Sequence, residues 1–247
     1  MSNTTRLIWT CIGVGVVASM LIAAVVWGYQ MRPSSDLCTS IEYIIDDRFE
    51  RLYVRETELD QLLSSENIDP VGRSINTLSL HRIEQTILRH PMVRTAECYL
   101  TPRNEVKVRL TQRIPLLRVQ TPGDTYFIDT DRKVMPARPI VKDSVLLATG
   151  AVGVQIASHQ LADFAEWLQD EPYWQRRIHH VYVHSPQMVY VYLKGENMPR
   201  VLLGAMSNYD SKLAKLRTFF EHGVEATKDK NYTELDLRFK GQVIGRI

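Results

Sequence analysis

The stretch from Leu7 to Met31 (LIWTCIGVGVVASMLIAAVVWGYQM) contains no Asp, Glu, Lys or Arg. As a helix it reaches roughly 37 Å, which exceeds the roughly 30 Å of hydrocarbon in a bilayer. A cleaved signal peptide has a shorter apolar run and small residues at its cleavage site, whereas bulky residues stand there in this chain. The sequence therefore predicts an uncleaved transmembrane signal anchor over residues 7–31, with Trp27 and Tyr29 at the membrane interface.

The charges flanking this stretch do not decide its orientation, because Arg6 stands on one side and Arg32 on the other. A short leader (residues 1–6) before a signal anchor favours a cytoplasmic amino terminus, with the rest of the chain outside the cytoplasm. Of 30 Lys plus Arg, two flank the stretch, and the other 28 balance 28 Asp plus Glu. A neutral domain offers no field for a polyanion, so nucleic acid is not an expected partner.

Small side chains recur every fourth residue along the predicted anchor. Faces of this kind let two transmembrane helices approach closely, which would make the stripe a packing surface for a partner helix. Small residues are also common in apolar helices, so ordinary composition explains the stripe equally well. Its members are Cys11, Gly15, Ser19 and Ala23.

A spacer (residues 32–36) leads into a unit predicted over residues 37–113. Its order is strand, helix, helix, strand, strand, which suits two helices packed on one face of a three-stranded sheet. Ser79 is positioned to cap the second helix, and His90-Pro91 stops it. The expected elements are a strand over 38–45, a helix around Leu59, Leu62 and Leu63, a helix with Leu80, Ile83 and Ile87, and strands over 93–100 and 105–112.

Ile114-Pro115 marks a boundary, and residues 114–247 are dense in strand patterns. We expect a mostly antiparallel sheet with two helices packed on it, and an α+β fold for the whole chain. The expected strands are 116–120, 126–129, 145–149, 178–184, 189–193 and 201–203, and the expected helices contain Leu161, Phe164 and Leu168 and, later, Leu213, Leu216 and Phe220.

The last strand pattern is "ELDLRF", in which Leu235, Leu237 and Phe239 alternate with charged residues. This period of two predicts a strand with one buried face. A second short run, Val243 and Ile244, follows Gly241, and we expect it to leave an uncovered sheet edge that offers unpaired N–H and C=O groups.

Catalytic, metal and cofactor sites have no support in the sequence, which lacks the motifs of nucleophilic hydrolases, zinc proteases and phosphate-binding loops. His180 and His184 lie about 13 Å apart along a predicted strand, too far apart to share a metal. Asp129 and Asp131 flank a turn and could bind a cation, although Asp is a routine turn residue. Cys38 and Cys98 leave a disulfide open, because cysteine parity alone does not decide pairing.

The ordered motifs resemble those of the FtsQ/DivIB family of single-pass cell-division proteins. The segment "SLHRIEQTILRHPMVRTAECYLTPRNEVKVRL" followed by "QRIP" resembles the end of the family's POTRA domain. The segments "YFIDTDRKV", "VLLG", "KLAKL" and "ELDLRF" are similar to motifs of its β domain. The chain departs from the pattern at Gln112, where the family often has Glu, and at Arg132 and Lys133, where a glycine turn is common.

The resemblance implies a non-enzymatic divisome scaffold at the septum, with no cofactor and no small-molecule substrate. It also implies an anchor in the inner membrane and the bulk of the chain in the periplasm. Family members recruit the FtsB and FtsL pair through their last strand region, and so help to govern septal peptidoglycan synthesis; other divisome proteins contact the POTRA unit. Strand addition at the edge would supply the bonds, an aromatic anchor would add affinity, and glycine would let a second backbone approach. The positions that match the contact region are Phe239, Lys240, Gly241, Gln242, Val243, Ile244 and Gly245.

Two other classes of protein stay open at the level of sequence. POTRA units also occur in envelope assembly and secretion factors, but the single unit and the predicted inner-membrane anchor argue against that class. An anchored periplasmic hydrolase lacks any nucleophile with a nearby base.

Overall fold

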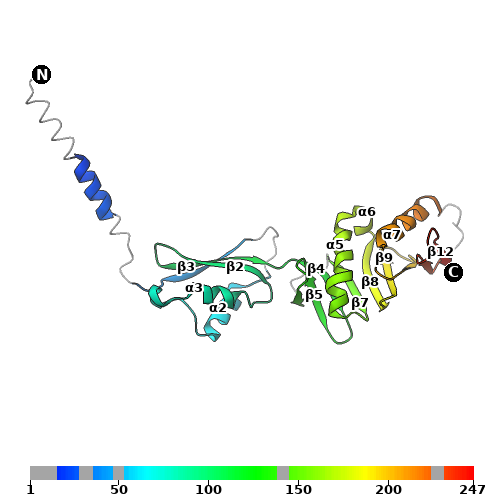
Figure 1. Cartoon of the computed structure of the whole chain (residues 1–247), viewed down its shortest axis with the longest axis horizontal. Helices are drawn as coiled ribbons and strands as arrows, with labels where there is room; N and C mark the ends of the chain where they lie inside the picture. Colours follow the sequence, from blue (N-terminus) through cyan, green and yellow to red (C-terminus); the bar gives the residue numbers. More distant parts are fainter. Residues whose placement is uncertain (1–15, 28–35, 47–52, 138–144, 224–230) are drawn as a thin grey trace, which may run out of the picture. The chain divides into compact units, whose positions relative to one another are not determined.

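The computed structural model describes residues 16–27, 36–46, 53–137, 145–223 and 231–247 (Figure 1). The chain divides into two compact units, Met1–Gln112 and Arg113–Ile247. Each unit contains its own β-sheet together with helices. The predicted α+β class is therefore confirmed.

Residues 16–27 form a helix with exposed side chains, in which the Ser19 hydroxyl donates a hydrogen bond to the Val16 carbonyl (2.8 Å). Among the helices of the described ranges, none combines the length and the hydropathy needed to cross a membrane. The predicted anchor extends beyond residues 16–27 on both sides. Ser19 and Ala23 of the small-residue stripe lie in this helix, and Cys11 and Gly15 lie outside the described residues.

The first unit contains a three-stranded sheet in the order β1-β3-β2, with β1 parallel and β2 antiparallel to β3. Both longer helices lie on the same side of this sheet (Figure 1). The elements are β1 (Ser40–Ile45), α2 (Glu56–Ser65), η1 (Ile75–Thr77), α3 (Leu80–Ile87), β2 (Val93–Leu100) and β3 (Glu105–Gln112).

Local sequence accounts for these elements. Glu56 and Glu58 occupy the first turn of α2, where the helix dipole favours negative charge. The Ser79 side chain accepts a hydrogen bond from the Arg82 amide (3.3 Å), which is the predicted cap of α3. The apolar residues of α2, α3 and β3 meet in one core formed by Leu59, Leu63, Ile83, Ile87, Val106, Val108 and Leu110.

The second unit is built on a nine-stranded sheet in the order β12-β11-β10-β9-β8-β7-β4-β5-β6. Most neighbouring strands are antiparallel, while the β4–β7, β7–β8 and β10–β11 pairs are parallel. The strands are β4 (Pro115–Gln120), β5 (Thr125–Asp129), β6 (Val134–Pro136), β7 (Leu146–Gly150), β8 (Ile178–Ser185), β9 (Met188–Leu193), β10 (Arg200–Gly204), β11 (Glu234–Asp236) and β12 (Ile244–Arg246).

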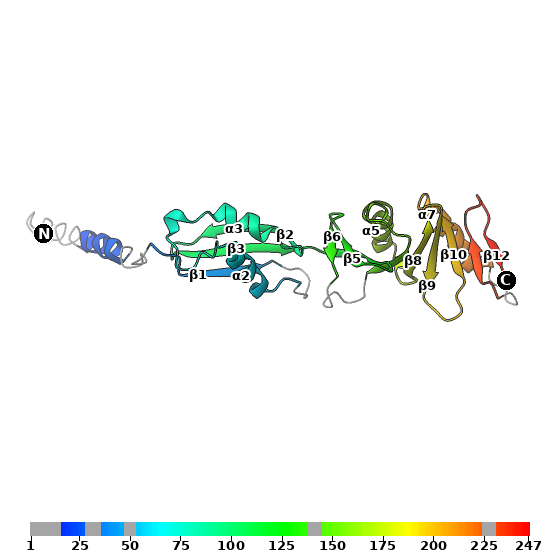
Figure 2. The same cartoon turned by 90° about the horizontal axis from the view of Figure 1, so that it is seen from below.

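The helices of the second unit cover one face of this sheet (Figures 1 and 2). Phe164 is fully buried there, and its ring packs edge-on against Tyr209, with centroids 5.1 Å apart. The opposite face carries partly exposed aromatic residues of β8 and β9, such as Tyr182 and Tyr190. The helical segments are α4 (Val154–Ile156), η2 (Ala157–Leu161), α5 (Ala162–Asp170), α6 (Pro172–Gln175), α7 (Tyr209–Thr218) and η3 (Phe219–Gly223).

Candidate partner-binding edge

Strand β12 stands at one end of the nine-stranded sheet (Figure 2). It runs antiparallel to β11, with Leu235 opposite Gly245, and β11 in turn runs parallel to β10. In the part of the chain that the structure describes, no strand pairs with the outer side of β12. The sheet therefore ends on a short exposed edge of the kind that accepts another strand.

The hydrogen bonds of β11 determine which backbone groups of β12 point outward. The Leu237 amide donates to the Leu202 carbonyl (2.9 Å), so Leu237 and, two residues earlier, Leu235 face β10. Glu234 and Asp236 then face β12, and their register partners on β12 face β11 in return. Gly245 lies between those two partners, so its N–H and C=O point to the outer side of the sheet.

A tyrosine ring packs directly over Gly245. A Cβ atom at this position would lie 2.2 Å from Cε1 of Tyr232, a separation that no real contact allows. The Tyr232 ring is itself held against Phe219, with ring centroids 6.2 Å apart. Glycine at this position thus lets the ring cover the inner face of β12.

We predict that Gly245→Ala destabilises the second unit by about 1 kcal/mol, because the Tyr232 ring must move away from the core. The loss should be measured by urea unfolding followed by tryptophan fluorescence, since Trp167 and Trp174 belong to this unit. In a Tyr232→Ala background the same substitution should cost nothing further. Additive losses in the double variant would contradict the steric explanation.

Two acidic residues of β11 are buried, which corrects the predicted alternation. The side chain of Asp236 is 0% exposed and that of Glu234 is 4% exposed. Arg238 pairs with Asp236 (2.7 Å), and Arg200 pairs with Glu234 (2.9 Å). Arg246 of β12 contacts both acids, at 3.0 Å from Glu234 and 3.6 Å from Asp236. Ion pairs therefore join β12 to β11 in addition to the backbone ladder.

Burial by itself raises the pKa of the Asp236 carboxyl. Hydrogen bonds from the side chain and the backbone of Arg238, together with the charges of Arg238 and Arg246, outweigh burial, so the pKa is lowered. The carboxylate is consequently ionised at neutral pH, and the ion pairs with both arginines are fully formed.

Helix α7 holds the segment between β11 and β12. The ammonium group of Lys215 donates to the carbonyl of Leu237 (3.1 Å) and to that of Phe239. Burial lowers the pKa of this ammonium, although the charge of Asp236 acts in the opposite direction. Lys215 thus binds the carbonyls on either side of Arg238, directly after β11 ends at Asp236.

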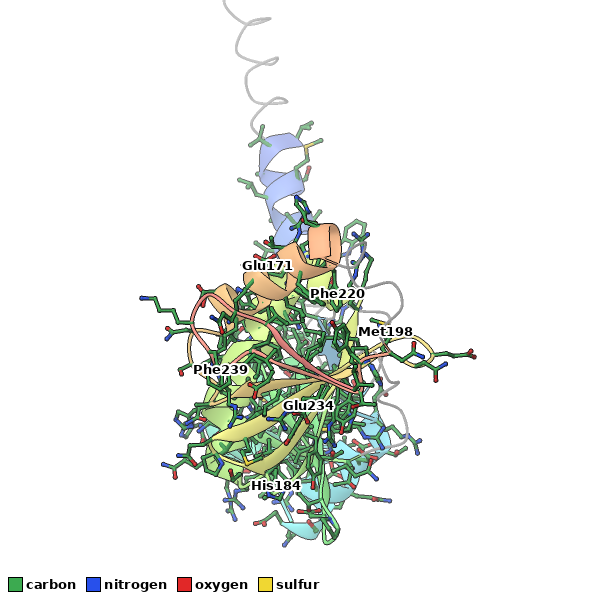
Figure 3. All side chains as sticks on the ribbon, turned by 90° about the vertical axis from the view of Figure 1, so that its right-hand side faces the viewer. Glu171, His184, Met198, Phe220, Glu234 and Phe239 are labelled. Atoms are coloured by element: carbon green, nitrogen blue, oxygen red, sulfur yellow. The ribbon has the colours of Figure 1, made fainter. Side chains whose placement is uncertain are left out.

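The predicted contact residues lie on this segment and on β12. Phe239 is 48% exposed (Figure 3). Ile244 of β12 is 38% exposed, so both residues offer apolar surface. The period of two in the sequence left two readings of Phe239, a core residue or a surface contact, and its exposed ring agrees with the surface reading. Lys240, Gly241 and Gln242 are exposed, with Gly241 at φ +72° in the turn, while Val243 packs partly against the core and Gly245 lies beneath Tyr232.

The other candidate residues of the sequence serve the fold. His180 is within 2.7 Å of the Thr149 hydroxyl and stacks on Tyr192, with ring centroids 4.9 Å apart. Asp129 is buried and pairs with Arg113 (2.7 Å), and its other oxygen accepts two backbone amides of the following turn. No cluster of metal-ligating side chains occurs within the described ranges.

The two candidate disulfide partners are both free thiols, Cys38 buried and Cys98 partly buried. Burial, together with the charge of Glu84, raises the pKa of the Cys98 thiol to about 12. The thiolate, which is the reactive form, is therefore scarce at neutral pH.

Tyr232, Lys215 and Asp236 shape the edge but were not singled out in the sequence. Lys215 lies within the segment "KLAKL" and Asp236 within "ELDLRF", and both segments were recognised in the sequence as family motifs. Tyr232 follows a charged stretch and carries no periodic signal of its own.

Each of the two units matches the model of a known protein family. Residues 114–246 match the family model described as FtsQ/DivIB, C-terminal related, which covers more than half of the chain. Residues 36–111 match the model described as a POTRA-like domain. No curated protein gives a significant sequence match to the chain.

Proposed function

Since the chain belongs to the FtsQ/DivIB family, we propose that it is a divisome scaffold whose β12 edge accepts a strand from an FtsB-like partner. The FtsB-like protein arrives as a pair with an FtsL-like protein, and the assembly helps to regulate septal peptidoglycan synthesis. The family is one of non-catalytic cell-division scaffolds, and the POTRA-like match fits that assignment.

One observation carries this proposal: the backbone of Gly245 points away from β11, at a sheet edge with no further strand in the described part of the chain. An added strand would bond to these groups and continue the sheet. The exposed ring of Phe239, in the segment that connects β11 to β12, offers an anchor for an apolar side chain.

A short edge binds weakly by itself. A few backbone bonds at roughly 1 kcal/mol each, with one aromatic contact, barely exceed the cost of association. A second contact between proteins held in one membrane makes strand pairing effectively intramolecular and raises the affinity. We assign that role to the anchor over residues 7–31, with its small-residue stripe, and to the POTRA-like unit over residues 37–113.

Under this proposal the chain is anchored in the inner membrane at the division septum, with the amino terminus in the cytoplasm and both units in the periplasm. The POTRA-like unit would bind further division proteins, other than the FtsB- and FtsL-like pair. The site over residues 239–245 is proposed for the FtsB-like strand.

Hydrogen exchange tests the strand-addition proposal. Addition of the FtsB and FtsL homologues should slow exchange of the Gly245 amide by about 100-fold, because a bond replaces its contact with water. The Leu237 amide is already bonded to the Leu202 carbonyl and serves as the internal control. Unchanged exchange at Gly245 in a saturated complex would rule out strand addition at this edge.

A further inference from the structure

A second surface of the β domain combines a pocket with two cations, Arg177 and Lys194, for which the described residues provide no ion pair. The pocket has a volume of about 390 Å³ and lies where α6, the end of β9 and η3 meet. Phe220 and Met198 mark it in Figure 3, on the opposite side of the view from Phe239. Its walls include Tyr173, Leu193, Met198 and Phe220, and its charged groups include Arg177 and Lys194.

The described residues of the pocket provide one carboxylate, and that carboxylate already has a partner. Arg217 forms an ion pair with Glu221 (2.8 Å), which accounts for the one carboxylate lining the pocket. Within the described ranges, neither Arg177 nor Lys194 forms a salt bridge. In the part of the chain that the structure describes, the pocket lining thus has two cations without an ion pair and no free carboxylate, so an anion would be attracted to it.

Arg177 is also held in place for recognition. Its guanidinium carbon lies 3.8 Å from the centroid of the Tyr173 ring, and one of its nitrogens donates to the Tyr173 carbonyl (3.0 Å). Arg217 lies over the same ring at 4.5 Å. A guanidinium fixed by stacking loses less entropy when it binds a carboxylate than a freely rotating side chain does.

The apolar residues decide which kind of anion fits. Leu193 is buried and Met198 is 41% exposed, and together with Phe220 they form an apolar surface next to the cations. A simple inorganic anion would leave this surface in water. A carboxylate next to an aromatic or aliphatic side chain would satisfy both parts of the pocket.

We propose that this pocket binds an acidic peptide segment of a partner protein, with a Glu or Asp on Arg177 and Lys194 and a neighbouring apolar side chain against Phe220 and Met198. The volume is small for an enclosed ligand but accommodates one or two side chains of a larger partner. This site does not depend on strand addition at β12.

The probe is a fluorescein-labelled peptide Gly-Ser-Glu-Phe-Ser-Gly-Ser, titrated with the full-length chain in detergent and followed by anisotropy. Two matched peptides replace Glu by Gln or Phe by Ala, and each should bind about tenfold more weakly. Equal binding of the Gln peptide would overturn the role of charge, and equal binding of the Ala peptide would overturn the role of the apolar wall. Complete displacement by inorganic phosphate at low millimolar concentration would identify a general anion site instead.

Variants locate the binding on the protein. Arg177→Gln should weaken binding about tenfold and Lys194→Gln about threefold, whereas Arg82→Gln, an exposed arginine of the first unit, should have no effect. Arg177→Lys should recover part of the affinity. If Arg82→Gln weakened binding as much as Arg177→Gln, the effect would be one of net charge and the site would not exist. Val243→Pro should bind the probe as the natural sequence does, which separates this test from that of the β12 edge.

Discussion

Replacing Val243 by proline should weaken capture of the FtsB and FtsL homologues by about 100-fold while the chain stays folded. Val243 and Gly245 share the inner face of the edge segment, because Val243 packs on the core and Gly245 lies under Tyr232. Val243 directly precedes β12, and continuing the strand alternation from Gly245 would direct the Val243 amide outward as well. Proline removes that donor and places a ring where the incoming backbone would lie. Co-purification from membranes at matched expression measures the loss.

Val243→Ala is the matched control for the amide. It removes more apolar side chain than proline does but keeps the N–H group. If recruitment depends on the backbone, the alanine variant binds and the proline variant does not. Capture of the partners by the proline variant at unchanged affinity would show that they bind elsewhere. Tryptophan fluorescence of both variants should match the natural sequence, since Trp174 is buried in the same unit.

Local patterns were sufficient to predict most of the fold. Ser79 was expected to cap a helix, and its hydroxyl does accept the Arg82 amide. The alternation over Glu105–Gln112 predicted a strand with one buried face, and Val106, Val108 and Leu110 are all fully buried. The Ser79 cap depends on a residue only three positions away, and the burial of the strand follows from the alternation of apolar and polar side chains. Features of these two kinds can be predicted from the local sequence alone.

Short elements were missed because their signals are too brief for a period to emerge. Strand β6 has three residues and ends on Pro136, which only an edge strand tolerates. Helix α6 has four residues, and Pro172 at its first turn was its only local mark. Both elements exist because neighbouring parts of the unit supply the contacts.

The edge itself could be predicted only in part. The resemblance to a known family identified residues 239–245, but the order of strands in the sheet decides which backbone groups point outward. The burial of Glu234 and Asp236 was not predictable from their own strand, because the neutralising arginines come from β10, β12 and the turn after β11. Charge compensation between strands depends on register, and register is set by the whole sheet.

The buried acid Asp236 gives the second large effect. Asp236→Ala should lower the free energy of unfolding of the second unit by about 2 kcal/mol at pH 7. The carboxylate accepts hydrogen bonds from the side chain and the backbone amide of Arg238 and pairs with Arg246, so its loss weakens the attachment of β12. The two arginine side chains are 40% and 58% exposed and can turn to solvent, which keeps the loss below that of a fully buried pair.

The pH dependence identifies charge as the cause. Because the folded pKa of Asp236 lies below its ordinary value of 3.8, its stabilising contribution is present above that pH and disappears as the pH falls through the lowered pKa. Asp236→Asn keeps the shape and one acceptor but cannot ionise. The stability difference between the natural chain and this variant, measured by urea unfolding between pH 7 and pH 2, should therefore shrink toward the acid end. A difference that stays constant over the whole range would mean that the residue stabilises β12 by packing and not by charge.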